Sequence, residues 1–313
     1  MYNYNSTGLV NYDGHTLLQK RLCEVHDLHG IRKKPQSKTN LIIITDLDGT
    51  LLDSDYSFTE AIPALNIIQE YDVPLILCSS KTMAEIAHCR KKLKNTHPFI
   101  SENGGGIFIH EKYFQFRIQG AGFRVQKEKN FYVIKLGADY SDLRNALHDL
   151  RSEGFDVTGF GDMSIEEVSA QTGLKSADAS RAKQRFFDEP FIFSGAASDV
   201  ENMKKSILVK GLSYTQGEFF HIMGDSDKGR AVEVLKDLYS KQRGEIITIA
   251  LGDSINDIEM LERADYPVVI QKQDGSYNSK VISKVKGCIK SGEIGPAGWN
   301  RAVLNLLHQF GIE

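Results

Sequence analysis

Two aspartates follow the first strongly apolar stretch of the chain. Asp46 and Asp48 belong to the run Asp-Leu-Asp-Gly-Thr, directly after the apolar residues 41–45. Such a stretch predicts a buried strand, and ligands of α/β sheets bind beyond the carboxyl ends of the strands. Residues two apart in an extended chain point the same way, so these carboxylates repel unless a cation neutralises them or one holds a proton. An ordinary turn before a helix is the alternative interpretation.

A second acidic pair follows another apolar stretch. Asp253 comes at the end of residues 246–251, and Asp257 lies four residues later, in the first turn of an expected helix. Together with Asp46 they would form a cluster of oxygen ligands suited to a hard cation such as Mg²⁺. Turn formation by Asp253 and a helix-dipole contact by Asp257 remain the simpler alternatives.

Hydroxyl and ammonium groups provide candidate phosphate contacts. Ser79 and Ser80 join an apolar stretch, residues 73–78, to a helix that begins with a capping box at Thr82. Hydroxyls and free N–H groups at a helix start bind phosphate well. Lys228 could hold both a phosphate and Asp46 by its charge. Helix capping alone, and a solvated surface lysine, are the alternatives.

Strands that alternate with helices must position these groups. The pattern predicts an α/β core with a doubly wound parallel, Rossmann-like sheet, built from residues 41–117 and 223–313. Residues 118–222 are less regular and predict an inserted α+β cap domain, with helices at 164–172 and 178–187. Residues 1–40 form an N-terminal extension, in which Leu18, Leu22 and Val25 could share one face of a short helix.

Composition narrows the class of protein. The 313 residues carry a net charge of −3, and 25% of them are charged, so no bulk basic bias indicates a nucleic-acid or membrane partner. No apolar run has the roughly 18 residues that a membrane-spanning helix needs. The four cysteines, in no metal-binding spacing, and the polar first residues favour a cytoplasmic protein. A monomer or a homodimer is expected.

In this order, the four motifs resemble those of the haloacid-dehalogenase superfamily: Asp-x-Asp-Gly-Thr, a serine after a strand, a lysine, and Gly-Asp-x-x-x-Asp. The resemblance covers about residues 41–313 and implies a Mg²⁺-dependent phosphatase. It implies that Asp46 is the nucleophile and Asp48 the general acid and base. It also implies that Ser79, Ser80 and Lys228 bind the phosphoryl group. The implied Mg²⁺ ligands are Asp46, the backbone carbonyl of Asp48, and Asp253, with Asp257 completing or orienting the site.

The insertion is similar to the cap of the mannosyl-3-phosphoglycerate phosphatase family. The similarity rests on residues 162–168 (Asp-Met-Ser-Ile-Glu-Glu-Val), 182–185 (Ala-Lys-Gln-Arg) and 189–191 (Glu-Pro-Phe), and on the closing residues 295–300. It implies a phosphorylated sugar-glycerate substrate and the hydrolysis of mannosyl-3-phosphoglycerate through an aspartyl-phosphate on Asp46. The implied substrate-binding residues are Lys81, Asn103, Gly104, Gln184, Arg185, Glu189 and His221.

Several alternatives stay open at this point. Arg185 has the planar fork that binds carboxylate or phosphate bidentately, but Arg185 and Gln184 could equally lie on a solvated helix face. His221 could be a core histidine. The substrate could be glucosyl-3-phosphoglycerate or another sugar phosphate. A sugar phosphomutase and a non-catalytic binding protein are the alternatives of a different class.

Overall fold

The computed structural model describes residues 40–118 and 123–313, and all structural statements concern these residues. The expected extension, with Leu18, Leu22 and Val25, lies outside the described residues except for Asn40. Cys78, Cys89 and Cys288 are free thiols, whereas Cys23 is not described. None of the described helices is long and apolar enough to cross a membrane.

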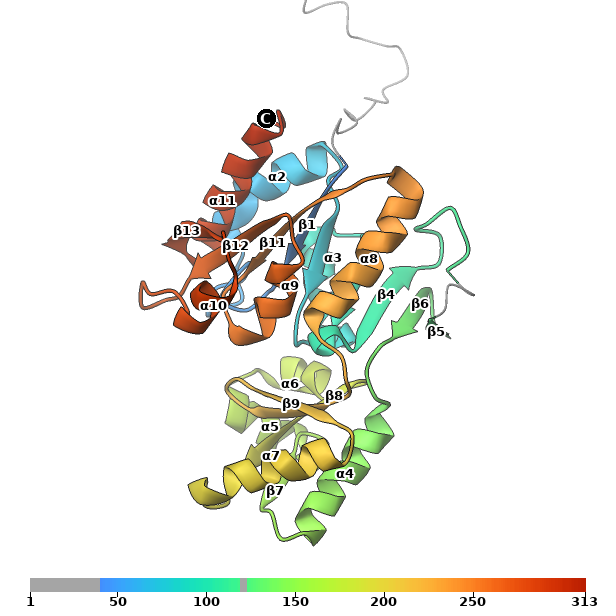
Figure 1. Ribbon diagram of the computed structural model, residues 1–313, viewed down its shortest axis with the longest axis vertical. Coiled ribbons are helices and arrows are strands. Elements are labelled where there is room, and N and C mark those ends of the chain that lie inside the picture. Colours follow the sequence, from blue (N-terminus) through green and yellow to red (C-terminus); the bar gives the residue numbers. More distant parts are fainter. Residues whose placement is uncertain (1–39, 119–122) are drawn as a thin grey trace, which may run out of the picture. The chain divides into compact units, whose positions relative to one another are not determined.

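A nine-stranded sheet forms the main part of the described chain (Figure 1). Its strands, in spatial order, are β13 (Ile289–Ile294), β12 (Tyr266–Gln271), β11 (Ile247–Gly252), β1 (Leu41–Thr45), β2 (Leu75–Cys78), β3 (Phe99–Ser101), β4 (Gly106–His110), β6 (Phe131–Lys135) and β5 (Arg124–Glu128). The first six run parallel, and the pairs β3–β4, β4–β6 and β5–β6 are antiparallel. The expected parallel core is therefore confirmed, with an antiparallel extension at one edge.

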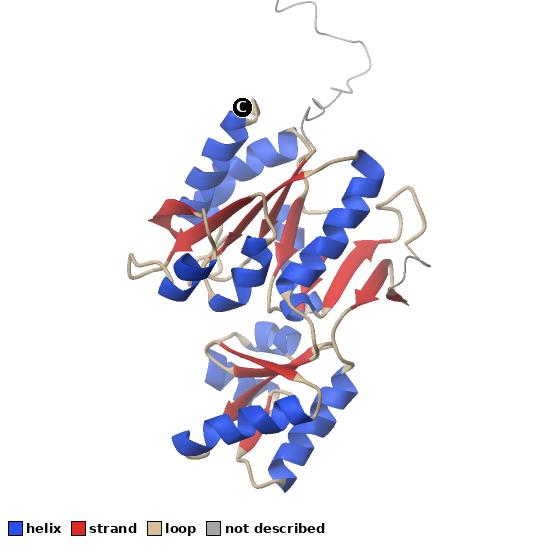
Figure 2. Ribbon diagram, in the orientation of Figure 1, coloured by secondary structure: helices blue, strands red, loops and turns tan. Residues whose placement is uncertain are grey.

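Helices cover both faces of this sheet (Figure 2). Alternation along β1 sends Leu41 and Ile43 to one face and Ile42 and Ile44 to the other, where separate apolar cores form. The first core includes residues of α2 (Ile62–Glu70), α3 (Met83–Leu93) and α11 (Gly295–Gln309), and the second includes residues of α8 (Lys228–Arg243), α9 (Ile258–Glu262) and α10 (Ser279–Lys284). Every residue of β1 is buried, which explains its uninterrupted apolar sequence.

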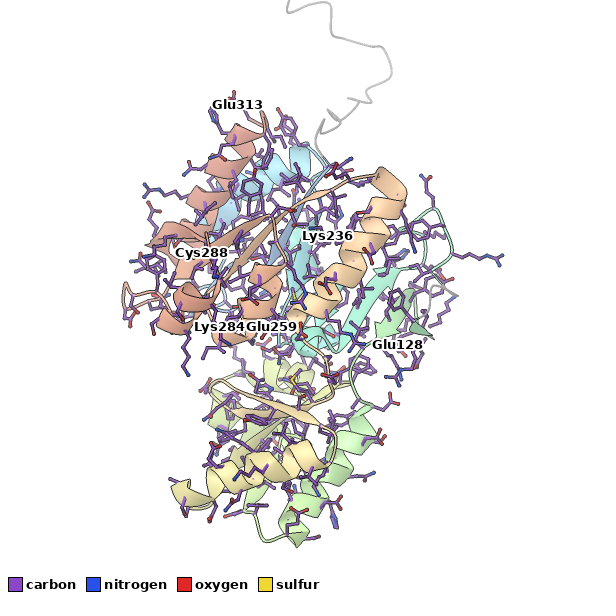
Figure 3. The ribbon with its side chains drawn as sticks, in the orientation of Figure 1. Glu128, Lys236, Glu259, Lys284, Cys288 and Glu313 are labelled. Atoms are coloured by element: carbon purple, nitrogen blue, oxygen red, sulfur yellow. The ribbon has the colours of Figure 1, made fainter. Side chains whose placement is uncertain are left out.

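Two helices of the second face approach each other closely. A Cβ on Gly229 of α8 would lie only 2.3 Å from the carbonyl oxygen of Glu259 on α9. Figure 3 marks Glu259 on α9 and Lys236 further along α8. This contact fixes the start of α8, where Lys228 lies, against the helix that follows Asp257.

A second, four-stranded antiparallel sheet forms the inserted domain, which we call the cap. Its strands, in spatial order, are β7 (Val157–Gly159), β8 (Asp188–Phe193), β10 (Phe220–Met223) and β9 (Ser213–Gln216). Its helices are α4 (Tyr140–Ser152), α5 (Ile165–Thr172), α6 (Ser176–Ala182) and α7 (Val200–Val209). Residues of α4 and α7 pack in one apolar cluster of the cap, and residues of α5 and α6 pack in another.

The structure differs from two expected boundaries. Strand β6 pairs with β4, and β5 pairs with β6, so both belong to the main sheet and the cap begins after Lys135 and not at residue 118. The helix expected at residues 178–187 spans Ser176–Ala182, and the chain then turns into β8. Four short 3₁₀ helices complete the described elements: η1 (Thr59–Ala61), η2 (Glu102–Gly104), η3 (Ala197–Asp199) and η4 (Ile255–Asp257).

Candidate active site

Asp46 and Lys228 meet at the carboxyl ends of the parallel strands. Asp46 directly follows β1 and is only 5% exposed. Lys228 is the first residue of α8, and its Nζ lies 2.7 Å from Asp46 Oδ1 and 2.6 Å from Asp257 Oδ1. The ammonium therefore bridges two carboxylates that are 182 and 29 residues away in the chain. Lys228 thus has buried partners and is not a solvated surface lysine.

Asp257 holds the turn that carries Asp253. Its second oxygen accepts hydrogen bonds from the backbone N–H groups of Asp253, at 3.1 Å, and Ser254, at 3.0 Å. Thr50 Oγ1 donates to Asp253 Oδ1 at 3.1 Å, which ties the same turn to the stretch after β1. Both oxygens of Asp257 therefore have protein partners, whereas Asp253 Oδ2 has no hydrogen-bond partner among the described residues.

Three carboxylates fit a hard cation. Ligand oxygens of Asp46, Asp253 and Asp257 lie within 4.8 Å of one another. Burial, and next the charge of Asp257, raise the pKa of Asp253 to about 6. Burial also raises the pKa of Asp46, although the ammonium of Lys228 opposes the shift. Carboxylates crowded in a buried site lose this repulsion when a divalent cation neutralises them, so the residues present suit Mg²⁺.

Asp48 has a different environment from Asp46. Its side chain is 46% exposed, and Asp48 Oδ2 lies 3.0 Å from Lys81 Nζ. The ammonium of Lys81 also lies 4.7 Å from the centre of the Tyr56 ring. The Asp48 side chain is thus outside the three-carboxylate group and points toward solvent and Lys81, where it can exchange protons.

The start of α3 lies beside these groups. Thr82 caps the helix and forms a capping box with Glu85, as the sequence predicted. Ser79 is buried, and its Oγ accepts a weak hydrogen bond from the N–H of Lys81 at 3.3 Å. The hydroxyls of Ser79 and Ser80 thus belong to a short loop between β2 and α3, at the same sheet edge as Asp46.

A cavity of about 680 Å³ opens next to Asp48 and is lined by residues of both domains. From the main domain it is lined by Asp48, Gly49, Tyr56, Ser80, Lys81, Asn103, Asn256 and Lys272, and from the cap by Phe160, Ala182, Arg185, Pro190, Thr215, Phe219 and His221. Its volume suits a small phosphorylated ligand. Lysine side chains of the main domain and Arg185 of the cap can bind an anion there, and the carboxylates of Asp48, Asp53, Glu85 and Glu218 also line the cavity.

Arg185 and His221 line the cavity from fixed positions. Arg185 Nη1 donates to the carbonyl oxygen of Ser80 at 3.2 Å, and its Nε donates to the carbonyl of Ala182 at 2.9 Å. His221 Nδ1 lies 2.8 Å from Asp188 Oδ1. The solvated-face alternative for Arg185 is wrong, because its side chain is only 6% exposed.

Three other predicted substrate residues have mainly internal contacts. Gln184 is exposed, lies outside the cavity lining, and bonds the Ser180 carbonyl at 3.1 Å. Glu189 is buried and accepts hydrogen bonds from Tyr140 and Arg144. A side chain on Gly104 would lie 2.1 Å from the carbonyl of Asp227, so this residue serves close packing at φ +90°. These positions disfavour direct substrate contacts.

Several cavity residues were not predicted from the sequence. Lys272 follows β12 and lies close enough for its charge to lower the pKa of Asp253. Tyr56 and Phe219 are cavity residues in irregular loops. A single aromatic or lysine between strands has no distinguishing spacing. Only the fact that Lys272 follows a parallel strand could have indicated its place.

The fold and this site define a class of protein, and comparison with known sequences agrees. The sequence profile of the haloacid dehalogenase-like hydrolases matches residues 43–280, more than half of the chain. The chain therefore belongs to the haloacid dehalogenase-like hydrolase family, which confirms the expected membership. Crystal structures of a Thermoplasma acidophilum protein and of a Bacteroides thetaiotaomicron phosphatase of this superfamily have the same fold. Their TM-scores are 0.60 and 0.58, at 17% identity, and they cover 88% and 91% of this chain and 99% and 100% of their own.

Closer relatives narrow the comparison. A glucosyl-3-phosphoglycerate/mannosyl-3-phosphoglycerate phosphatase from Methanococcoides burtonii is 45% identical and covers 85% of this chain and 97% of its own length. A Persephonella marina protein of the same name is 38% identical over 86% of this chain and 98% of its own. The mannosyl-3-phosphoglycerate phosphatase of Pyrococcus furiosus is 32% identical over 80% of this chain and 98% of its own length. The similarity to these three phosphatases includes the cap.

Proposed function

We propose that the protein is a Mg²⁺-dependent phosphatase that hydrolyses mannosyl-3-phosphoglycerate and its glucosyl equivalent to the glycosylglycerate and phosphate. The observation that carries the proposal is the buried Asp46–Lys228–Asp257 group beside a cavity lined by Arg185 and His221. The names of the relatives from Methanococcoides burtonii and Persephonella marina include both sugars, and this supports activity on both.

In the proposed first step, an Asp46 carboxylate oxygen attacks phosphorus and the ester bond to the glycerate oxygen breaks. Asp48 gives its proton to this leaving alkoxide, which departs as an alcohol. Lys228 favours the ionised form of Asp46 and keeps the carboxylate in place, since its ammonium is 2.7 Å from one carboxylate oxygen. The product of this step is a phosphoryl group bonded to Asp46.

In the second step, water replaces Asp46 on phosphorus. Asp48, now ionised, takes a proton from the water as its oxygen bonds to phosphorus, and the bond to Asp46 breaks. The net change is one ester and one water converted to one alcohol and one phosphate. Mg²⁺ bound by Asp46, Asp253 and the Asp48 carbonyl, with Asp257 orienting the site, would neutralise charge on the phosphoryl oxygens.

The cap residues provide contacts for the rest of the substrate. Nε and Nη1 of Arg185 donate to the carbonyls of Ala182 and Ser80. The remaining N–H groups of the guanidinium, on Nη1 and Nη2, are the ones that can donate to a substrate carboxylate. His221 and Asn103 lie beside it in the cavity lining and suit sugar or glycerate hydroxyls. The cytoplasm fits the free thiols of the described cysteines, and we propose that location for a monomer or homodimer.

A phosphate-release assay with Mg²⁺ tests this function. It compares mannosyl- and glucosyl-3-phosphoglycerate with simple hexose phosphates and 4-nitrophenyl phosphate. We expect the highest kcat/KM for the two phosphoglycerates. A clear preference for hexose phosphates would reject the substrate, and isomerised sugar phosphate without free phosphate would indicate a mutase instead.

A further inference from the structure

Asp188 is a buried carboxylate with no assigned role in the reaction. It is the first residue of β8, and its side chain has no exposed surface. Its oxygens contact three side chains: His221 Nδ1 at 2.8 and 3.0 Å, Asn103 Nδ2 at 2.8 Å, and Arg185 Nη1 at 3.8 Å. Asp188 thus touches three residues that line the cavity without lining it itself.

The Asp188 carboxylate determines which ring nitrogen of a neutral His221 carries the proton. Burial alone would raise the pKa of Asp188, but His221, Arg185 and Asn103 together lower it below its ordinary value. Because an ionised carboxylate only accepts hydrogen bonds, the proton of a neutral His221 ring lies on Nδ1. In that neutral form, Nε2 has its lone pair free to accept a hydrogen bond from a substrate hydroxyl; in the charged form both nitrogens donate, and Asp188 still fixes the orientation of the ring. The opposite tautomer would offer a donor instead.

The same carboxylate connects the cap to the turn that carries Asp253. Since Asp188 only accepts, the amide nitrogen of Asn103 must face it, and the amide oxygen is left for another donor. That donor is Asn256 Nδ2, at 3.0 Å. Asn256 lies between Asp253 and Asp257, so a continuous series of hydrogen bonds runs from His221 to the acidic turn.

A neighbouring contact holds the backbone of this segment in place. Glu102 Oε2 accepts hydrogen bonds from the N–H groups of Phe186, Phe187 and Asp188, at 2.9, 2.7 and 3.0 Å. Residues 102 and 103 of the main domain thus bind segment 186–188 of the cap through both its backbone and the Asp188 side chain. Two sets of hydrogen bonds therefore hold Asp188 relative to the acidic turn: the side-chain series through Asn103 and the backbone contacts with Glu102.

We propose that Asp188 is a positioning residue, which orients His221 and Arg185 for the non-phosphoryl part of the substrate. The hydrogen bonds through Asn103 and Asn256 hold Asp188 itself in place relative to the main domain. This inference rests on the proposed function, because it assumes that cap residues bind the non-phosphoryl part of a phosphate ester. Asp188 itself contacts neither the substrate nor the reacting phosphorus.

Asp188→Asn tests the proposal, because it keeps the size of the side chain and removes its charge. We expect kcat/KM for the preferred glycosyl phosphoglycerate to fall about 10- to 100-fold, as hydrogen bonds to a charged group are lost. Hydrolysis of 4-nitrophenyl phosphate, which has no sugar or glycerate for the cap to bind, should stay within about threefold of the wild type. A purely structural defect would reduce both reactions alike.

A double-mutant cycle adds a second readout. In a His221→Ala background, Asp188→Asn should reduce kcat/KM for the glycosyl substrate much less than it does in the wild type, since the group it orients is gone. Equal losses on both substrates, or full additivity with His221→Ala, would overturn the proposal. Should Asp188→Asn fail to fold, ¹⁵N chemical shifts of the His221 ring in the wild type give a second test: the neutral ring should carry its proton on Nδ1, and a proton on Nε2 would overturn the proposal.

The two proposals fail in different ways. If the wild type does not hydrolyse glycosyl phosphoglycerates, the proposed function is rejected. The role of Asp188 is then judged on whichever larger phosphate ester the wild type does hydrolyse, against 4-nitrophenyl phosphate.

Discussion

Lys228 and Asp257 form an ion pair with an N–O distance of 2.6 Å, in which neither side chain is exposed. Burial lowers the pKa of Lys228, but the charges of Asp257 and Asp46 outweigh this effect and raise it. An ammonium held between two buried carboxylates stays charged at any pH at which the enzyme works. Lys228 is thus a permanent cation at the point where the phosphoryl group would be transferred.

Lys228→Met should destabilise the metal-free protein and abolish phosphate release. It leaves two buried carboxylates without their cation, which costs about 3–5 kcal/mol in comparable sites. Urea unfolding in EDTA measures this loss, and added Mg²⁺ should recover part of it by taking over the neutralisation. Lys241→Met, at an exposed position near the end of the same helix, is the matched control and should change stability by less than about 0.5 kcal/mol. Equal unfolding curves for the two variants would contradict this account of the site.

Mg²⁺ affinity should fall as the pH drops below about 6, because burial and Asp257 raise the pKa of Asp253 to about 6. A proton on this carboxyl competes with the cation, so below that pH the affinity should decrease by up to about tenfold per pH unit. Isothermal titration calorimetry at several pH values between 5 and 7.5 measures the slope. Asp253→Asn should bind Mg²⁺ more weakly throughout and show less dependence on pH. An affinity that is constant from pH 5 to 7.5 in the wild type would exclude Asp253 as a ligand.

Arg185→Ala should raise KM for the glycosyl phosphoglycerate about 10- to 100-fold, by removing a charged donor to the substrate. The effect on 4-nitrophenyl phosphate should be much smaller, because that compound has no carboxylate. Steady-state kinetics on both substrates gives the ratio. Gln184→Ala is the matched control, since the neighbouring Gln184 side chain is exposed, lies outside the cavity lining and donates to the Ser180 carbonyl in the preceding helix α6. Parallel losses on the two substrates would show that Arg185 has no part in specificity.

Glu102→Gln should change how stability depends on pH. Burial is the main cause that raises the pKa of Glu102 to about 7. Its Oε1 is buried and has no hydrogen-bond partner within the described residues, so no hydrogen bond offsets the loss of water around this oxygen. The folded wild type therefore binds a proton more readily than the unfolded chain, and the stability from this group decreases as pH rises from about 4.5 to 7.

The glutamine variant lacks this titration. The free energy of unfolding of the wild type relative to Glu102→Gln should therefore fall by about 2–3 kcal/mol between pH 5 and 8. Urea unfolding at both pH values checks the sign and the size. A difference between the two proteins that does not vary with pH would show that Glu102 keeps an ordinary pKa in the fold.

The sequence predicts the main-domain part of the site well, because the rule for parallel sheets places the ends of neighbouring strands together. Asp46, Ser79 and Asp253 follow β1, β2 and β11, which are adjacent in the sheet. Each lies directly after an apolar stretch that can only be a covered strand. Lys228 needed the family resemblance, since a single lysine has no periodicity that reveals its partners.

The cap part is less predictable, for physical reasons that particular residues illustrate. The helical pattern at residues 178–187 ends at Ala182, where Lys183 is the C-cap, so Gln184 and Arg185 diverge instead of sharing a helix face. Asp188 and Glu189 are adjacent buried acids whose partners come from residues up to 85 positions away. Such long-range pairing leaves no local signal. The sequence alone places β5 and β6 in the cap, because nothing in these two stretches shows which sheet they join.

The central claim is that phosphate passes through a bond to Asp46, and phosphate release by Asp46→Asn tests it most directly. The assay uses saturating Mg²⁺ and the preferred substrate, with circular dichroism to check the fold. We expect the fold to be retained and the rate to fall at least about 10³-fold, because an amide is a far poorer nucleophile than a carboxylate. Turnover close to that of the wild type would contradict the aspartyl-phosphate mechanism.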